Sequence, residues 1–182
     1  LREALYKSRN VVSIRVMQRL GMGRALDYVQ RFGFTRQQLP RNLSMALGTL
    51  SATPMQMATA YTVLANGGFK VQPYLLEKVR DRNGQTLYEA APLRACPDCE
   101  TAVATNVGAD SLSTPPEGAS AVTPMGNMAP RVVDARIHFL INSMLQDVVR
   151  RGTGASARAL GRNDIAGKTG TTNGPTDAWF SG

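Results

Sequence analysis

The segment Lys168-Thr169-Gly170, followed by Thr171, limits the possible folds more than any other part of the sequence. It places a cation, two hydroxyls and a residue without a side chain within four positions. An extended strand of this composition can hold a carboxylate through the ammonium and the hydroxyls. The glycine lets the backbone of a ligand lie against the strand.

A nucleotide-binding loop is the first alternative, because Gly-Lys-Thr also ends the G-x-x-x-x-G-K-[ST] pattern. That pattern requires a glycine at position 162, where the chain has Arg162. A phosphate-binding loop also leads directly into a helix, whereas residues 169–175 contain two glycines, β-branched residues and a proline. We therefore predict a strand over 165–171, a turn at 173–175 and a return strand over 178–180.

Ser8-Arg9-Asn10 is the second candidate motif. Residues two apart on a helix point in roughly opposite directions, so Ser8 and Asn10 can share a cavity only if this triplet is a loop. The sequence predicts a helix over 11–20, and Ser or Asn before a helix also acts as an ordinary N-cap. On residue types alone capping is the more frequent role, and both interpretations stay open.

Taken together and in this order, the two motifs resemble the second and third motifs of the penicillin-interacting serine enzymes. The sequence is also similar to the transpeptidase domain of bifunctional (class A) penicillin-binding proteins, those of type 1a in particular. This similarity covers most of the chain, with matching segments at 7–15, 46–49, 53–54, 65–68, 151–154 and 177–180. Residues from about 90 to 130 show none of it.

The resemblance also implies a missing part. In the family, a first motif, S-x-x-K, carries the nucleophilic serine and the lysine that activates it. None of the ten serines here has a lysine three residues later. We therefore expect residues 1–182 to be an internal part of one transpeptidase domain, with the nucleophile on a segment outside them.

The implied fold is the α+β fold of penicillin-binding proteins and β-lactamases, an antiparallel central sheet flanked by helices, here incomplete. We expect one partial domain over 1–182, with a flexible low-complexity insertion at about 90–130. That insertion holds six of the ten prolines and no aromatic residue, a composition that cannot supply a core.

The implied reaction is acyl transfer from the D-Ala-D-Ala end of a peptidoglycan stem peptide, a reaction that β-lactams block by acylating the serine. By the resemblance, Ser8 lies in the proton path, and Asn10 positions the substrate amide and the lysine of the absent motif. Lys168 supplies positive charge near Ser8 and the substrate carboxylate.

The strand residues take the remaining roles that the resemblance implies. Thr169 and Thr171 bind the carboxylate, the Thr171 N–H forms half of the oxyanion hole, and Gly170 lets the ligand approach. Two alternatives remain on the same fold: a non-catalytic peptidoglycan-binding module, and a β-lactamase or D,D-carboxypeptidase.

The expected partners are peptidoglycan stem peptides, β-lactam antibiotics and the remainder of the domain that carries S-x-x-K. No cofactor and no metal is expected. Residues 1–42 carry a net charge of +7, but their arginines are scattered without stacking aromatics, which indicates a solvated surface and no nucleic-acid partner. The family implies a membrane-anchored parent at the periplasmic face of the bacterial inner membrane, also a glycosyltransferase, with this segment soluble.

Local patterns predict the remaining elements. We expect a helix over 24–32, a capped helix from Thr53 to Ala65, a hairpin from 74–79 and 85–88, and a helix after Asp134 that ends at Gly152. The stripe Val12, Val16 and Leu20 is expected to be core. Cys96 and Cys99 fit a redox couple, half of a zinc site or a small disulfide, and for a periplasmic protein the disulfide is expected. His138 is expected to be a packing or surface residue.

Overall fold

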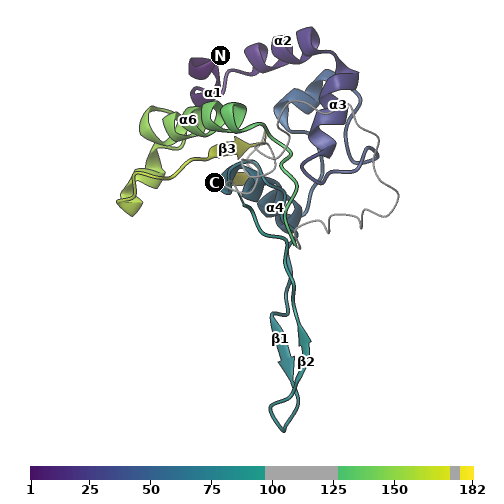
Figure 1. Ribbon diagram of the computed structural model, residues 1–182. Helices are drawn as coiled ribbons and strands as arrows, with labels where there is room; N and C mark the ends of the chain where they lie inside the picture. Colours follow the sequence, from purple (N-terminus) through teal and green to yellow (C-terminus); the bar gives the residue numbers. More distant parts are fainter. Residues whose placement is uncertain (97–126, 173–176) are drawn as a thin grey trace, which may run out of the picture. The chain divides into compact units, whose positions relative to one another are not determined.

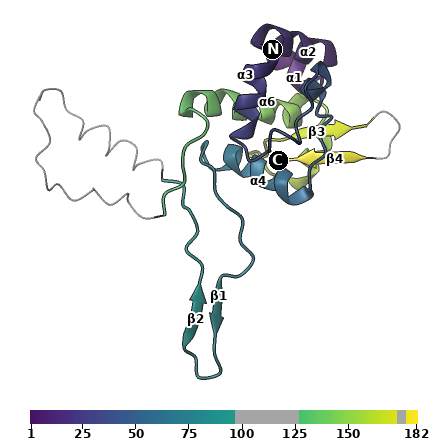
Figure 2. The ribbon, with the colours of Figure 1, turned by 90° about the vertical axis from the view of Figure 1, so that its right-hand side faces the viewer.

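The computed structural model (Figures 1 and 2) describes residues 1–96, 127–172 and 177–182. The predicted turn at 173–175 lies outside these residues, as does most of the insertion predicted at 90–130. The chain forms two compact units. Unit 1 comprises Leu1–Lys70 with Arg131–Gly182, and unit 2 comprises Val71–Pro130.

Three helices open unit 1: α1 (Arg2–Tyr6), α2 (Asn10–Leu20) and α3 (Met22–Gln30). The five-residue α1 was not predicted. The helix predicted from 11 begins one residue earlier, at Asn10. The helix predicted over 24–32 spans Met22–Gln30 instead. Gly21 alone, with φ 87° and ψ 138°, separates it from α2.

The expectation that the apolar stripe of α2 is core is wrong. Val16 and Leu20 are each 42% exposed, and no residue of α2 is buried. This helix packs instead on the 3-10 helix η1 (Leu43–Leu47) and reaches the core through Met17.

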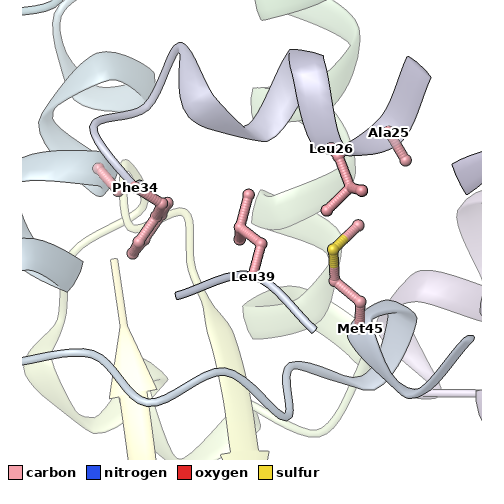
Figure 3. Close-up of a cluster of buried hydrophobic side chains, with 6 residues drawn as sticks. Ala25, Leu26, Phe34, Leu39 and Met45 are labelled. Atoms are coloured by element: carbon pink, nitrogen blue, oxygen red, sulfur yellow. The ribbon is translucent and has the colours of Figure 1, made fainter. Parts of the chain in front are cut away.

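The capped helix from Thr53 to Ala65 is confirmed as α4 (Pro54–Ala65). The Gln56 backbone N–H donates to the Thr53 hydroxyl at 3.2 Å, and the Thr53 N–H donates back to the Gln56 side chain at 2.9 Å. This reciprocal pair satisfies two N–H groups that have no partner inside the helix. Figure 3 shows the side chains of the main hydrophobic cluster, which joins α3 and η1 to α4: Ala25, Leu26, Phe34, Leu39, Met45 and Ala60.

The second half of unit 1 begins with α6 (Ala135–Arg151). The Asp134 carboxylate accepts from the backbone N–H of Arg136 and Ile137, which confirms the predicted cap. Helix α6 lies against α1, buries Leu145 and Val148, and leads through Gly152 into the 3-10 helix η2 (Ala155–Leu160).

A two-stranded antiparallel sheet ends the chain, formed by β3 (Lys168–Thr171) and β4 (Ala178–Ser181) (Figure 2). Strand β3 begins at Lys168, three residues later than the strand predicted over 165–171. Its register pairs Thr169 with Phe180 and Gly170 with Trp179. Strand β3 contacts α6, and β4 contacts α4, so helices flank the sheet as the family resemblance implies.

Unit 2 contains a hairpin of β1 (Lys78–Arg80) and β2 (Thr86–Glu89). The predicted first strand at 74–79 is wrong in its bounds, since pairing begins at Lys78. The Asp81 carboxylate stabilises the turn by accepting from the N–H of Asn83 at 2.9 Å and of Gln85 at 2.8 Å.

Candidate active site

Ser8 occupies the short turn between α1 and α2. Its backbone has a φ of +53°, one of two such values among the described non-glycine residues. A left-handed conformation is costly for a residue with a β-carbon, so surrounding contacts must hold it in place. Those contacts come from α1, where the Ser8 N–H donates to Leu5 O at 3.1 Å and the Arg9 N–H donates to Ala4 O at 2.8 Å.

Helix α1 is in turn fixed to α6 by an ionic cluster. The Asp147 carboxylate, on a residue only 8% exposed, accepts from Arg2 at 2.8 Å and from Arg151 at 2.7 Å. These hydrogen bonds, from Arg151 first and then Arg2, lower the pKa of the Asp147 carboxyl. Arg2 also donates to the Ser143 hydroxyl at 3.0 Å, so the turn that carries Ser8 is held against α6.

Lys168 meets Ser8 from the other side of the site. Its ammonium donates to the Ser8 hydroxyl at 2.6 Å and to the carbonyl of Thr169 at 2.8 Å. Burial lowers the pKa of this ammonium, because a charged group loses hydration when it is enclosed. The structure thus brings together the motif at residue 8 and the motif at residue 168.

The remaining residues of β3 are more open. Gly170 and Thr171 are exposed, and a β-carbon placed on Gly170 would meet no atom within 4 Å. In the described part of the chain β3 pairs with β4 alone, so its other edge keeps backbone groups available. Side chains alternate along a strand, which places the Thr169 and Thr171 hydroxyls on one face.

Gly167, directly before β3, is required by close packing. A β-carbon there would lie 2.5 Å from the ring of Phe180 and 2.7 Å from Ser181 O. Any side chain at this position would push β3 away from β4. This glycine therefore fixes the start of the strand that carries Lys168.

Asn10 is the first residue of α2, so the expectation that the whole triplet Ser8-Arg9-Asn10 is a loop is wrong for its last member. The N-cap of α2 is Arg9, and no side chain caps the helix. The ordinary capping role considered for Ser8 and Asn10 is therefore not observed. Among the described residues, no hydrogen bond joins the Asn10 side chain to Ser8 or Lys168.

The sequence reasoning missed Thr153. Its hydroxyl lies 2.5 Å from the Thr169 hydroxyl, although it is 16 residues away. The segment 151–154 is similar in sequence to the family, but residue types alone gave no sign that this threonine reaches the strand.

The other polar candidates lie apart from this site. His138 Nε2 is 2.8 Å from Leu64 O, so the ring packs between α6 and the end of α4. Cys96 is disulfide-bonded, whereas Cys99 lies outside the described residues.

Within the described ranges, no three His, Cys, Asp or Glu residues are grouped so that they could hold a metal ion. None of the described helices has the length and apolar character that crossing a bilayer requires.

The fold and this arrangement agree with one family. The model of the penicillin-binding protein transpeptidase domain matches residues 1–178. The chain therefore belongs to the penicillin-binding protein transpeptidase family, and the expected α+β fold, incomplete in these residues, is confirmed by the solved structures of that family.

Individual relatives carry the same family name. The chain is 49% identical to penicillin-binding protein 1A of Pseudomonas aeruginosa and 42% identical to that of Neisseria meningitidis, in each case over its whole length. The crystal structure of penicillin-binding protein 1A from Haemophilus influenzae is similar over 99% of the chain, with a TM-score of 0.80 and 37% identity. The chain spans only 24%, 19% and 27% of these three proteins, respectively.

Proposed function

We propose that this chain is the part of a serine-type D,D-transpeptidase that carries the proton path and the carboxylate-binding strand. The observation that carries the proposal is the 2.6 Å hydrogen bond from the Lys168 ammonium to the Ser8 hydroxyl, next to a strand that pairs on one side only among the described residues. An ammonium beside a hydroxyl suits proton transfer, because the charge stabilises the hydroxyl oxygen when it releases its proton.

The proposed reaction is acyl transfer between peptidoglycan stem peptides. A serine on an S-x-x-K segment outside residues 1–182 attacks the carbonyl of the penultimate D-Ala and expels the terminal D-Ala as an amine. An amine of a neighbouring stem peptide then takes the acyl group and releases the serine. Each step moves one proton, from the attacking group to the leaving group.

Ser8 and Lys168 are the proposed proton-transfer groups. The Ser8 hydroxyl passes the proton toward the leaving amine, and Lys168 keeps that hydroxyl oriented through their hydrogen bond. The lowered pKa of Lys168 favours this role, because it reduces the cost of sharing the proton along the path. Asn10, at the start of α2, is proposed to position the substrate amide and the lysine of the S-x-x-K motif.

The proposed carboxylate site lies on β3. The hydroxyls of Thr169 and Thr171 face the same side of the strand and donate to the terminal carboxylate of the substrate. The Thr171 N–H supplies half of the oxyanion hole. Gly170 lets the ligand backbone pair with the open edge, as in strand addition.

The same site is proposed to accept β-lactams, which present a reactive carbonyl and a carboxylate in place of D-Ala-D-Ala. We also propose that the parent protein is membrane-anchored at the periplasmic face of the inner membrane and carries a peptidoglycan glycosyltransferase. A non-catalytic peptidoglycan-binding module is the second candidate, and it applies if the full-length gene product has no S-x-x-K segment. A β-lactamase would further require a residue that activates water against the acyl-enzyme.

Labelling with a fluorescent penicillin tests these alternatives. The full-length gene product should become covalently labelled, and the label should persist through denaturing electrophoresis. Residues 1–182 expressed alone should remain unlabelled, because the nucleophile is proposed to lie elsewhere. An unlabelled full-length protein would favour the binding module, and rapid loss of the label with release of hydrolysed penicillin would favour a β-lactamase.

A further inference from the structure

The turn Gly152-Thr153-Gly154 follows α6 and is fixed by backbone hydrogen bonds on two sides. The N–H groups of Gly152 and Gly154 both donate to Val148 O, at 3.1 and 3.0 Å. The Thr153 N–H donates to Tyr6 O at 3.1 Å, at the end of α1. The turn therefore joins α6 to the helix that leads to Ser8.

Close packing on both sides of Thr153 prevents the turn from moving. A β-carbon on Gly152 would lie 2.4 Å from Tyr6 O, and one on Gly154 would lie 3.2 Å from the ring of Phe180. Each glycine lets a neighbouring segment approach more closely than a side chain would allow. Thr153 is itself exposed, so its side chain is presented toward the site from a rigid support.

The Thr153 hydroxyl is 2.5 Å from the Thr169 hydroxyl, and either can be the donor. A threonine hydroxyl donates one hydrogen and accepts two. The Thr169 hydroxyl also lies 3.5 Å from the Lys168 ammonium, which only donates. When Thr153 donates as well, the Thr169 oxygen accepts on that side, and its own hydrogen is left for a ligand.

We propose that Thr153 is a positioning residue that orients the Thr169 hydroxyl to donate to the carboxylate of the bound peptide or β-lactam. Thr153 acts through Thr169 and does not touch the ligand. This inference rests on the proposed function, because it assigns the carboxylate to Thr169. The Thr153 N–H also donates to Tyr6 O at the end of α1. Thr153 therefore contacts both the helix that leads to Ser8 and the strand that carries Thr169.

The test measures the acylation rate of the full-length protein by a fluorescent penicillin, over a range of concentrations. Thr153→Val keeps the shape but removes the hydroxyl, and should lower the second-order rate about three- to tenfold, the effect of one lost hydrogen bond. The loss should appear mainly as a higher penicillin concentration at half of the maximal rate, with the maximal rate little changed, because the carboxylate is bound before the carbonyl reacts. Thr153→Ser should restore the rate. Thr59→Val is the matched control, since its hydroxyl donates to Met55 O within α4.

Two further measurements separate positioning from a structural role. Thr153→Val combined with Thr169→Val should react no more slowly than Thr169→Val alone, because Thr153 acts only through that hydroxyl. A penicillin whose carboxylate is esterified should react with wild type and Thr153→Val at the same rate. Thr153→Ala provides a second variant, with melting curves recorded for each.

A wild-type rate for both Thr153→Val and Thr153→Ala would overturn the inference, as would losses that multiply in the double variant or persist with the ester. The proposed function fails separately, when wild type itself is not acylated. If wild type reacts and Thr169→Val is slow while Thr153→Val is normal, only the role of Thr153 is lost.

Discussion

The Lys168 ammonium donates a hydrogen bond to the Ser8 hydroxyl at 2.6 Å, although 160 residues of chain separate the two. Local structure alone does not bring these two residues together. Ser8 is held by α1 against α6, and Lys168 begins a strand whose start is fixed by Gly167 against Phe180. Two independent sets of contacts therefore converge on one hydrogen bond, as expected for groups that act on the same ligand.

Lys168→Met should strongly slow acylation by fluorescent penicillin in the full-length protein without lowering its melting temperature. Burial lowers the pKa of this ammonium, so its charged form is disfavoured by folding at neutral pH, and that cost decreases as the pH rises toward 10.5. Removal of the charge should therefore affect the reaction by about a hundredfold or more, while folding is spared.

Lys78→Met is the control for this exchange, because it removes one positive charge from the hairpin of unit 2, where Lys78 pairs with Glu89. It should react at the wild-type rate. A Lys168→Met protein that acylates normally would contradict the role assigned to Lys168, and one that melts far lower would show a structural role instead.

Ser8→Gly and Ser8→Ala separate the hydroxyl from the backbone strain. Both remove the acceptor of the Lys168 hydrogen bond, so both should slow acylation to a similar extent. The φ of +53° is costly with a β-carbon and free for glycine. The Gly variant should therefore be more stable than the Ala variant by about 1 kcal/mol, measured by denaturant unfolding. Equal stability would mean that the turn relaxes when the hydroxyl is lost.

Local sequence signals predicted those elements whose ends are set by their own side chains. The reciprocal cap of Thr53 and Gln56 and the cap at Asp134 both appear where expected. The five-residue α1 escaped prediction because it has no side-chain cap. It depends on Arg2, which contacts Asp147 across 145 residues of chain, and such a contact leaves no local pattern.

The same distinction applies to the site. The motifs at Ser8 and Lys168 were recognised by their similarity to the motifs of the family, since neither triplet alone indicates more than a cap or a strand. Thr153 was not found, because a threonine between two glycines is typical of many turns. Its contact with Thr169 depends on where α6 ends relative to β3, which is a property of the tertiary structure.

Asp147→Asn should destabilise unit 1 at neutral pH by about 1–2 kcal/mol, because the cluster with Arg151 and Arg2 loses its charge-assisted hydrogen bonds. The folded-state pKa of Asp147 is lowered below its ordinary value of 3.8. Its contribution is therefore complete above that pH and is lost as the pH falls through the lowered folded-state value.

Thermal unfolding of wild type and Asp147→Asn between pH 7 and pH 2 measures this contribution. The two curves should differ at pH 7 and converge in acid. Asp164→Asn is the control, since Asp164 pairs with Arg162 in an exposed segment after η2. A constant difference between wild type and Asp147→Asn at every pH would show that the lost stability does not come from the carboxylate charge.

Replacement of Val71–Pro130 by a linker of about four residues should leave unit 1 folded and acylation intact. The two ends of this segment meet in unit 1, where Phe69 pairs with Arg131 and the Val132 N–H donates to Gly68 O at 2.8 Å. The Arg131 guanidinium also lies over the Phe69 ring at 4.1 Å and donates to Gly67 O. A short linker can span two backbone segments that are already bridged to each other.

Gly68→Ala in the uncut protein is the matched test of that junction. Gly68 has a φ of +98°, and a β-carbon there would lie 2.4 Å from Val133 O, so this exchange should lower the melting temperature where the excision does not. Melting curves and penicillin labelling of both variants decide the outcome. An excised protein that folds but is no longer labelled would mean that Val71–Pro130 contributes to the reaction, and one that fails to fold would mean that the Phe69–Arg131 junction cannot close unit 1 by itself.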